Sequence, residues 1–518
     1  MIVSVNSVVV PVVTLFLPRK SDFSEPSGQR RWRDTTIRGV SDPELDVRAD
    51  TPLPRSLPAR SRTAIFVLGS CFHRRLDVRD IELVVGGAAT EATAQGMPRL
   101  DRYRALPDAH SYRSGFWAIV PVEAPPAGVI EVAVRATLAD GTTDEAPVGR
   151  IPVSDLPSIE PEAIARAGGS GARVAIAMAT FDPDLELFRN QVESIRAQTI
   201  DDWICVVSDD CTPPPAFERM RAVLDGDRRF VLSRSGRRLG FYKNFERVLA
   251  LVPAATPYVA LADQDDRWYP EKLQTLLDSL GDAQLVYSDQ RVVDTGGRVV
   301  AEGYWTDQRR NNYTNLASLL IANTVTGAAS LFRRALLDDA LPFPEPPGDQ
   351  FHDHWLGLVA LSTGRIAYVD RPLYDYVQHE SATLGHVAAN VGVNRGVFVA
   401  RLLRGQWRGL FSGWRAAYFL AYCRLRLLAE VLLMRAGGTI DRRSSRTLRR
   451  FARSERSPVG FTWLAVRGAR RWFGRTETLG AERLLVQGIL WRYLIKALAA
   501  GRRRPSRRLP ADASLSGG

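Results

Sequence analysis

The 518-residue sequence predicts an α/β protein whose mostly parallel sheet, flanked by helices, is preceded by a small β-sandwich-like domain and followed by a basic helical region. Three observations support this prediction. Short strand-like runs separated by turn residues occupy 61–155. Strand and helix patterns alternate over 172–390. Between 391 and 500, apolar residues at helical spacing are interleaved with arginines.

The first sixty residues are expected to lie outside these folded parts. The stretch 2-IVSVNSVVVPVVTLFLP-18 is apolar, but no basic residue precedes it and no small-residue cleavage pattern follows, which disfavours a signal sequence. Pro11 and the many valines disfavour a spanning helix, so a buried strand and a misassigned start codon remain as interpretations. Residues 19–60 lack periodicity and predict a partly disordered linker. A disordered tail is expected at 501–518.

The segment 61–155 predicts an antiparallel sandwich. Runs such as 64-AIFVLG-69, 116-FWAIVPV-122 and 129-VIEVAVRATL-138 are rich in β-branched and aromatic residues, and Asp140-Gly141 supplies a turn after the last of them. Nothing in this segment suggests catalysis. The Gly/Ser linker 168-GGSGA-172 then leads to a different pattern.

The central segment alternates strands with helices. The strands are 174-VAIAMAT-180, 203-WICVVS-208, 230-FVLS-233 and 258-YVALA-262, and helical patterns lie in 185–198, 216–224 and 241–252. This alternation is typical of βαβ units and a parallel sheet. Ligands of such sheets bind beyond the carboxyl ends of the strands. The fold rule therefore gathers five residues along one edge: Thr180, Asp209, Asp210, Asp263 and Asp265.

Three acids, Asp263, Asp265 and Asp266, follow the run 258–262 within four residues. Neighbouring carboxylates raise one another's pKa unless a cation lies between them, so this cluster is either solvated or holds a cation. Ligand sets made only of oxygen suit Mg²⁺ or Mn²⁺, the ions that bridge diphosphates. Asp266 is expected instead to cap the helix that begins near Pro270.

Several classes of function lose their main support. A calcium loop of the DxDxDG type would need an acid or amide at Arg267 and a glycine at Trp268. No GxGxxG follows a strand and no GxxxxGK[ST] occurs, which disfavours dinucleotide oxidoreductases and P-loop nucleotide hydrolases. The 4 cysteines form no CxxC pair, so neither a zinc site nor a disulfide framework is predicted, and a reducing compartment fits best.

The net charge of +12 is unevenly distributed. Residues 1–394 carry 42 Lys and Arg against 51 Asp and Glu, a net of −9, whereas 395–518 carry 27 against 6, a net of +21. A basic block of this kind usually meets nucleic acid or anionic lipid headgroups. A solvated extension without a partner is the alternative.

The basic segment also contains apolar helical faces. Leu, Phe, Trp and Tyr alternate with Arg in 398-FVARLLRGQWRGLFSGWRAAYFLAYCRLRLLAEVLLMR-435, 461-FTWLAVRGARRWF-473 and 484-LLVQGILWRYLIKAL-498. Such faces fit helices on a membrane surface, and equally an amphipathic bundle packed on the body. No nucleic-acid motif accompanies them, so we expect no nucleic-acid partner. No uninterrupted run of about twenty apolar residues occurs after residue 18, and we predict no transmembrane helix.

The central segment resembles family 2 glycosyltransferases with the Rossmann-like GT-A fold, and it is most similar to bacterial rhamnosyltransferase-like members. Six motifs follow the family's order: 174–212, with 194-SIRAQT-199 ending a helix and 209-DDCT-212 ending a strand; 239-LGFYKNFERVL-249; 263-DQDD-266 followed by W-x-P-E-K-L; 323-NTVTGAASLFRR-334; 351-FHDHWLGLVA-360; and 374-YDYVQHESATLG-385. The resemblance covers roughly 172–390 and implies a GT-A catalytic domain there.

The resemblance implies a donor site. Thr180, Phe181 and Asp210 would line the nucleotide base and ribose, and Asp209 would support the turn. Arg237, Arg238 and Lys243 would contact the diphosphate or else form a solvated basic loop. Asp263 and Asp265 match the family's D-x-D motif. Asp265 would bind Mn²⁺ or Mg²⁺ directly, Asp263 would be its partner, and His379 would complete the metal shell.

The resemblance also implies a general base. Asp353 matches the acid that takes a proton from the acceptor hydroxyl, and apolar neighbours such as Trp355 would raise its pKa toward a working range. A single base without a second nucleophilic carboxylate implies direct displacement, with inversion at the anomeric carbon.

The implied activity is metal-dependent transfer of rhamnose or a similar hexose from a UDP- or dTDP-sugar to a glycan or lipid-linked acceptor. The implied context is cell-surface polysaccharide synthesis at the cytoplasmic face of the membrane. Asp182 stands where the family usually has Asn and Val377 where it has Arg, which leaves the donor open. The alternative is a non-catalytic GT-A-like protein that binds glycan or a partner. Both key carboxylates, Asp265 and Asp353, are present, which favours the enzyme.

Overall fold

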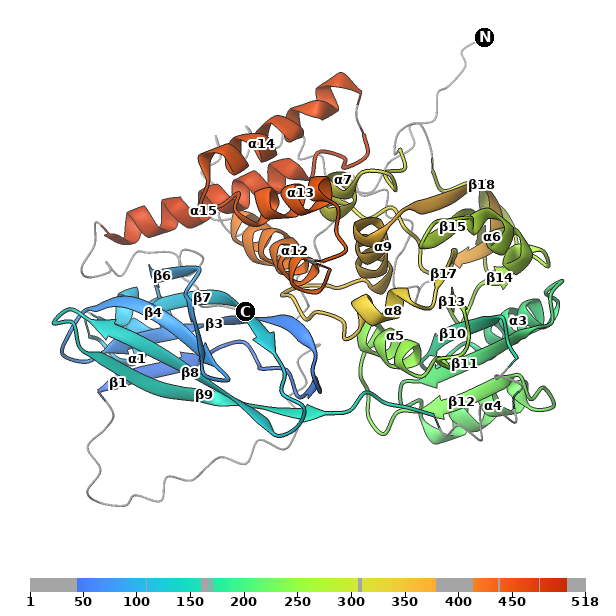
Figure 1. Ribbon diagram of the computed structural model, residues 1–518, viewed down its shortest axis with the longest axis horizontal. Coiled ribbons are helices and arrows are strands. Elements are labelled where there is room, and N and C mark those ends of the chain that lie inside the picture. The colour runs from blue at the N-terminus through green and yellow to red at the C-terminus, as the bar shows by residue number, and fades with distance from the viewer. Residues whose placement is uncertain are drawn as a thin grey trace, which may run out of the picture.

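The computed structural model describes residues 44–108, 110–159, 167, 171–305, 310–378, 413–436, 438–474 and 476–500. A β-sandwich, an α/β domain and a helical region that lies against both make up the described chain (Figure 1). The predicted fold class is confirmed in all three parts. The predicted tail at 501–518 lies outside the described residues, as do residues 1–43 and His379.

The sandwich has two sheets. The four-stranded sheet has the order β1 (Leu45–Ala49), β3 (Arg62–His73), β7 (Gly115–Glu123) and β6 (Ala94–Met97); the five-stranded sheet has the order β2 (Leu57–Pro58), β9 (Thr143–Ser154), β8 (Val129–Leu138), β4 (Val78–Val85) and β5 (Ala88–Glu91). The domain thus begins at Leu45 and not at residue 61. β1 pairs antiparallel with β3, and Leu45 lies in the core between the sheets, so this part of the expected linker is folded.

One sheet of the sandwich is buried on both faces. Phe116 and Val120 of β7 point into the core between the two sheets, whereas Trp117 and Ile119 join the larger core shared with the α/β domain and the helical region. Successive strand side chains point to opposite faces, so a continuous apolar run such as FWAIV fits a strand covered twice.

The α/β domain is built on a nine-stranded sheet. The order is β12 (Phe230–Arg234), β11 (Trp203–Asp209), β10 (Val174–Thr180), β13 (Tyr258–Ala262), β17 (Ser330–Arg333), β15 (Leu285–Asp294), β18 (Ile366–Gln378) and β14 (Arg267–Trp268), with β16 (Val299–Ala301) beside β15. Six strands run the same way, because β15 and β18 regain the direction of β13 after the antiparallel β17.

Helices cover both faces of this sheet (Figure 1). They are α3 (Leu185–Arg196), α4 (Pro214–Leu224), α5 (Phe241–Ala250), α6 (Lys272–Leu280), α7 (Leu316–Ile321), α8 (Leu336–Ala340) and α9 (His352–Thr363). The side chain of Asp184 caps α3 by accepting hydrogen bonds from the backbone N–H groups of Glu186 and Leu187. α9 is buried on nearly all sides, because the helical region packs against it as well.

The helical region comprises η2 (Ala417–Cys423), α12 (Arg424–Arg435), α13 (Arg442–Ala452), α14 (Pro458–Ala469), η3 (Arg470–Phe473) and α15 (Glu482–Ala500). α12 packs on β3 of the sandwich and on α7 and α9 of the α/β domain. The buried Glu455 carboxylate accepts hydrogen bonds from Tyr418 Oη at 2.5 Å and Arg426 at 3.0 Å and pairs with Arg492 at 2.7 Å. The described part of the basic segment is therefore a bundle packed on the body. In these ranges no helix combines the length and apolarity needed to cross a bilayer.

Candidate active site

The ends of neighbouring strands bring the predicted residues to one edge of the sheet. β10 and β11 are in register from Val174 opposite Trp203 to Thr180 opposite Asp209, and Ala262 at the end of β13 pairs with Met178 of β10. The antiparallel β17 starts at this edge, so the segment 323–327 that precedes it also lies there. The predicted convergence of these strand ends is seen in the structure.

On the β11 side, Asp210 holds the loop before α5. Its Oδ1 accepts the backbone N–H of Leu239 at 2.6 Å, and its Oδ2 accepts that of Gly240 at 2.8 Å. Gly240 has φ +85°, a left-handed conformation that favours glycine, and it begins α5. The carboxylate is buried and Arg238 lies 4.0 Å away. The structure thus shows Asp210 supporting a loop, and its contact with a nucleotide stays a prediction.

Two further residues lock the ends of β10 and β11. Asp209 is fully buried; its Oδ2 accepts the Thr212 N–H at 3.1 Å and pairs with Arg234 at 3.4 Å. Asn244, which sequence reasoning passed over inside the motif 239–249, donates to the carbonyls of Ser208 at 2.9 Å and Thr180 at 3.2 Å. The sequence did contain an indication of this role, because Asn244 is a polar residue on the face of the helix that is expected to be buried.

Phe181 and Gln264 connect the first turn to the acidic segment. Gln264 Oε1 accepts the backbone N–H of Phe181 at 2.8 Å, and Gln264 Nε2 donates to the Phe181 carbonyl at 3.3 Å. The guanidinium carbon of Arg238 lies 3.2 Å from the centre of the Phe181 ring. The middle residue of the D-x-D motif thus fixes the distance between the two strand ends.

The acidic cluster contains two carboxylates with raised pKa values. Burial, together with the charges of Asp265 and Asp353, raises the pKa of Asp263 to about 7, although Lys272 lowers it. Burial, Asp263 and Asp265 hold the pKa of Asp266 well above its usual range. Asp266 is no helix cap, because α6 starts at Lys272 after Glu271 without a side-chain cap, and the Asp266 carboxylate is buried without a hydrogen bond of normal geometry to any described residue.

Lys272 is the cation beneath this cluster. It is fully buried; its Nζ donates to the Ala328 carbonyl at 2.5 Å and lies 3.7 Å from the centre of the Trp268 ring. Burial lowers its pKa well below the usual value, and the charges of Asp266 and Asp263 oppose this shift. Lys272 belongs to the W-x-P-E-K-L motif, but the motif alone gave it no role.

A further carboxylate with a raised pKa at this edge is that of Asp353, in the first turn of α9. Burial raises its pKa to about 7, against the lowering effect of hydrogen bonds from the backbones of His354 and Gly327 and from the Asn323 side chain. Its charge contributes to the raised pKa of Asp263, which shows that the two carboxylates interact. The edge of the sheet therefore brings together acids that are some ninety residues apart in sequence.

His352 and His354 support Asp353 from either side in sequence. The His352 ring stacks on Phe245 with centroids 3.6 Å apart, and a Cβ at Gly327 would lie 2.5 Å from its Nε2. His354 Nε2 lies 2.8 Å from the Leu319 carbonyl. Burial lowers the pKa of both histidines to about 3, so both are neutral at pH 7. The two rings fix the start of α9, and Asp353 with it.

The acidic residues fit a divalent cation that also binds phosphate. Among the described residues no group of three or more His, Cys, Asp or Glu side chains is arranged to hold a metal ion. The charge of Asp265 nevertheless contributes to the raised pKa of Asp263. Mg²⁺ commonly takes one or two carboxylates and completes its shell with water and substrate phosphates, which matches this pair. His379, the predicted third ligand, lies outside the described residues.

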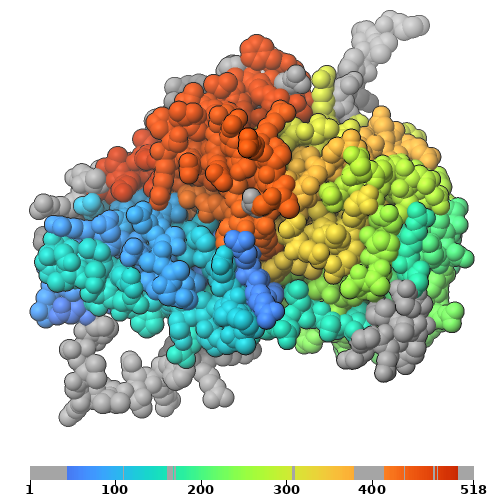
Figure 2. Space-filling view, in the orientation of Figure 1, coloured from blue at the N-terminus to red at the C-terminus, as the bar shows by residue number. Residues whose placement is uncertain are grey.

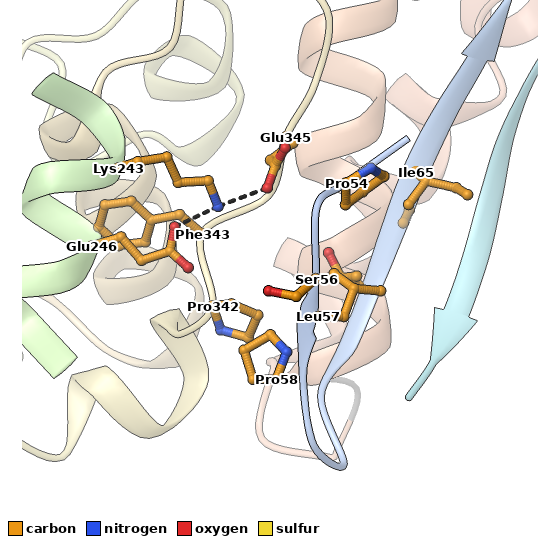
Figure 3. Close-up of a pocket in the computed structure, with 12 residues that line it drawn as sticks. Pro54, Ser56, Leu57, Pro58, Ile65, Lys243, Glu246, Pro342, Phe343 and Glu345 are labelled. Atoms are coloured by element: carbon orange, nitrogen blue, oxygen red, sulfur yellow. Dashed lines mark hydrogen bonds and ion pairs between the residues drawn. The ribbon is translucent and has the colours of Figure 1, made fainter. Parts of the chain in front are cut away.

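Lys243 is a correction to the sequence interpretation. Its ammonium pairs with Glu246 at 2.5 Å and Glu345 at 2.8 Å in a pocket between α5 and strands β2 and β3 of the sandwich (Figure 3). The rotation of α5 turns this side chain away from the strand ends, so a contact with the diphosphate is not supported. Arg237, by contrast, lies exposed in the loop after β12, and its predicted role is untested.

The fold and this cluster of strand-end acids define an α/β domain whose ligand-binding edge lies at the carboxyl ends of its parallel strands. Residues 176–341 match the model of the glycosyl transferase family 2, so the chain contains a domain of that family. The expected family is thereby confirmed for this segment.

Two curated relatives match parts of the chain. An uncharacterized protein, y4gI, of Sinorhizobium fredii is 26% identical over 229 residues, which are 43% of this chain and 24% of the relative. The uncharacterized glycosyltransferase MJ1057 of Methanocaldococcus jannaschii is 26% identical over 133 residues, 25% of this chain and 45% of the relative. The chain thus spans less than half the length of either relative.

Two solved structures are also similar to this chain. TarS 1-349 of S. aureus in complex with UDP-GlcNAc has a TM-score of 0.36 and 16% identity, covering 60% of this chain and 90% of that one. The mannosyltransferase PcManGT of Pyrobaculum calidifontis in complex with GDP-Man and Mn²⁺ has a TM-score of 0.31 and 15% identity, covering 62% of this chain and 87% of that one.

Proposed function

We propose that this protein is an inverting glycosyltransferase that moves a hexose, rhamnose or a similar sugar, from a nucleoside diphosphate to a glycan or lipid-linked acceptor. The observation that carries the proposal is the pair Asp263 and Asp353, half-buried at one edge of the sheet, each with a pKa raised to about 7. A raised pKa matched to the working pH is what a general base needs.

Asp353 is the proposed base. Its carboxylate would accept the proton of the acceptor hydroxyl as that oxygen forms a bond to the anomeric carbon. The bond from the anomeric carbon to the diphosphate oxygen breaks in the same step. Attack from the face opposite the leaving group inverts the configuration. Neutral His352 and His354 hold the start of α9, and Asn323 orients the carboxylate.

Asp263 and Asp265 would bind the donor's diphosphate through a divalent cation, Mn²⁺ or Mg²⁺. Such an ion, when bound, neutralises charge on the departing diphosphate. The charge of Lys272 lowers the pKa of Asp263 and so offsets part of the cluster's negative charge. On the β11 side, Asp210 and Gln264 would shape the surface that receives the base and ribose.

The donor is tested with the purified full chain. A thermal-shift panel of uridine, deoxythymidine and guanosine diphosphates, with and without Mn²⁺, should show one base that raises the melting temperature only with the ion. Release of that nucleotide from its sugar, dependent on a lipid-linked or glycan acceptor, then measures transfer. The variant D338N, an exposed aspartate of α8, is the matched control for D353N. Tight donor binding without any turnover in an acceptor screen would favour the alternative, a non-catalytic binding protein.

We place the reaction at the inner face of the cell membrane, where lipid-linked glycan intermediates are built. The basic charge of the C-terminal segment supports this localisation.

A further inference from the structure

The last helix, α15, is apolar on two sides. Leu485, Ile489 and Ile495 are buried against the bundle. Leu490, Tyr493, Leu494 and Leu498 are 40%, 46%, 44% and 56% exposed, and their spacing puts them on one face of the helix. Exposing four large apolar side chains in a row is costly in water, and a contiguous exposed patch of this kind marks an interaction surface.

α14 and the turn after it extend this patch. Val459, Val466 and Phe473 recur every seven residues and are 69%, 63% and 81% exposed. Tyr493 Oη of α15 donates to the Glu455 carbonyl at 2.5 Å, four residues before Val459, so α15 lies against the chain just before α14. We call these residues of α14 and α15 the outer apolar face.

α13 beside it carries only basic charge. Seven arginines of α13 and the following turn are exposed: Arg442, Arg443, Arg446, Arg449, Arg450, Arg453 and Arg456. Within the described ranges no carboxylate lies in ion-pair contact with any of them, whereas exposed arginines of the sandwich are paired, such as Arg62 with Glu123 and Arg150 with Glu131. The guanidinium of Arg450 lies 5.9 Å from the Trp463 ring of α14, which joins the basic strip to the outer apolar face.

We propose that the outer apolar face and the arginines of α13 together dock on an anionic phospholipid bilayer. A lipid surface can bind both groups of side chains at the same time. Its headgroup phosphates neutralise the guanidinium groups, and the apolar side chains enter the boundary with the acyl chains. Nucleic acid would use the arginines but leave the apolar side chains in water. The sequence after Ala500 adds five arginines within eight residues.

A hydrogen bond links α14 to the helix that leads to the catalytic edge. Arg467 of α14 donates to Ser318 Oγ of α7 at 2.9 Å, and α7 leads directly to Asn323, which hydrogen-bonds to Asp353. In Figure 2 the helical region occupies the upper left of the molecule, above the sandwich and beside the α/β domain. A bilayer bound there would hold Asp353 at a set height above the lipid, as a lipid-linked acceptor requires.

This inference deepens the membrane part of the proposed function, and its test needs no sugar transfer, so the two can fail separately. Co-sedimentation of the full chain with phosphatidylcholine vesicles, with and without phosphatidylglycerol, measures binding. We expect strong binding only with phosphatidylglycerol. The variant R442Q/R446Q/R449Q should lower the partition coefficient on the order of 100-fold, since each basic residue near the surface contributes about 1 kcal/mol. L494S/L498S should lower it at least about tenfold.

Matched controls remove the same groups elsewhere. R189Q/R219Q/R228Q takes three exposed arginines from around α3 and α4, and V299S/V300S takes two exposed valines from β16; both should bind vesicles as the wild type does. An equal loss in either control would overturn the proposal, since binding would then follow overall charge or hydrophobicity. It would also be overturned if R442Q/R446Q/R449Q lost binding to a DNA duplex but not to vesicles. A dimer that L494S/L498S dissociates would identify the face as a contact between copies instead.

Discussion

Asp210 and Asp353 lie at the same edge of the sheet, but the protein treats their carboxylates differently. Asp210 receives two backbone N–H groups, at 2.6 and 2.8 Å, and lies near Arg238. Asp353 also accepts hydrogen bonds, from the backbones of His354 and Gly327 and from Asn323, but desolvation outweighs them and its pKa rises to about 7, as does that of Asp263. A buried carboxylate that the protein compensates supports structure. A carboxylate whose ionisation stays unfavourable lowers the stability of the fold, and it is retained because it binds a ligand or accepts a proton.

The largest effect is expected for D353N. Removing a general base should lower turnover on the order of 10²–10⁴-fold. Because the folded pKa is raised from 3.8 to about 7, the stability that protonated Asp353 contributes is lost as the pH rises from about 4 to 7, and the full cost of its ionisation applies above pH 7. The neutral asparagine is free of this cost, and at pH 8 the variant should be more stable by about 1–2 kcal/mol. Turnover and urea unfolding check both parts. An active D353N would remove Asp353 from the mechanism.

D265N should reduce transfer on the order of 10²–10³-fold, since it removes a carboxylate from the pair that would hold the cation and diphosphate. Titration calorimetry should show that the nucleoside diphosphate no longer binds more tightly with Mn²⁺ than without it. The exposed Asp338 gives the control D338N, which should retain the ion's effect. Unchanged Mn²⁺ dependence in D265N would assign the ion to other residues.

The activity should depend on pH through Asp353. The base works in its ionised form, so below its pKa of about 7 kcat/KM should fall about tenfold for each pH unit. A pH series with the wild-type chain, at saturating Mn²⁺, measures the profile. A rate that stays level down to pH 5 would show that Asp353 is ionised there and that burial does not tune it.

On the compensated side, D210N should act mainly on the fold. The amide nitrogen of asparagine would meet a backbone N–H donor at Leu239 or Gly240, which costs a hydrogen bond and about 1–3 kcal/mol. We expect a lower melting temperature and a higher donor KM, with kcat reduced much less than in D353N. D225N, at an exposed position after α4, serves as the control. A kcat loss as large as that of D353N would show that Asp210 and Asp353 are equally important for turnover, which contradicts the proposed difference between them.

The smallest effect is expected for G327A. The added Cβ would lie 2.5 Å from His352 Nε2, so the ring stacked on Phe245 must shift, at about 1–3 kcal/mol. Because Gly327 also hydrogen-bonds to Asp353, kcat should fall while donor binding persists. G236A, where a Cβ meets nothing within 4 Å, is the matched control. Melting and kinetics of both variants decide whether the histidine positions the base.

Much of the α/β domain was predictable, because local patterns carry it. The strand run 174–180 and the strand 258–262 have the predicted bounds, and the helix expected in 185–198 is α3 (Leu185–Arg196). The rule on strand ends then placed Thr180, Asp209 and Asp263 at one edge. Lys243 shows the limit of this reasoning: it lies in a motif, but the orientation of α5 in the packed domain turns it toward Glu345.

Other features depended on contacts between distant segments. β1 was read as linker, because its few apolar residues become a strand only when β3 pairs with them. The burial of Asp266 and Lys272 depends on segments that are 50 or more residues apart in sequence. The support of Asp353 depends on Asn323 and Gly327, in a loop that only folding brings close to it.

By itself the sequence determined the alternation of strands and helices, the family resemblance and the identity of the acids, because these follow from periodicity and residue type along the chain. Tertiary structure decided which acids are compensated and which are not. It also decided which apolar faces of the C-terminal helices are buried against the body and which stay exposed beside unpaired arginines. The reason is that desolvation and charge pairing are set by neighbours in space, and the same carboxylate can be a loop anchor or a base depending on them.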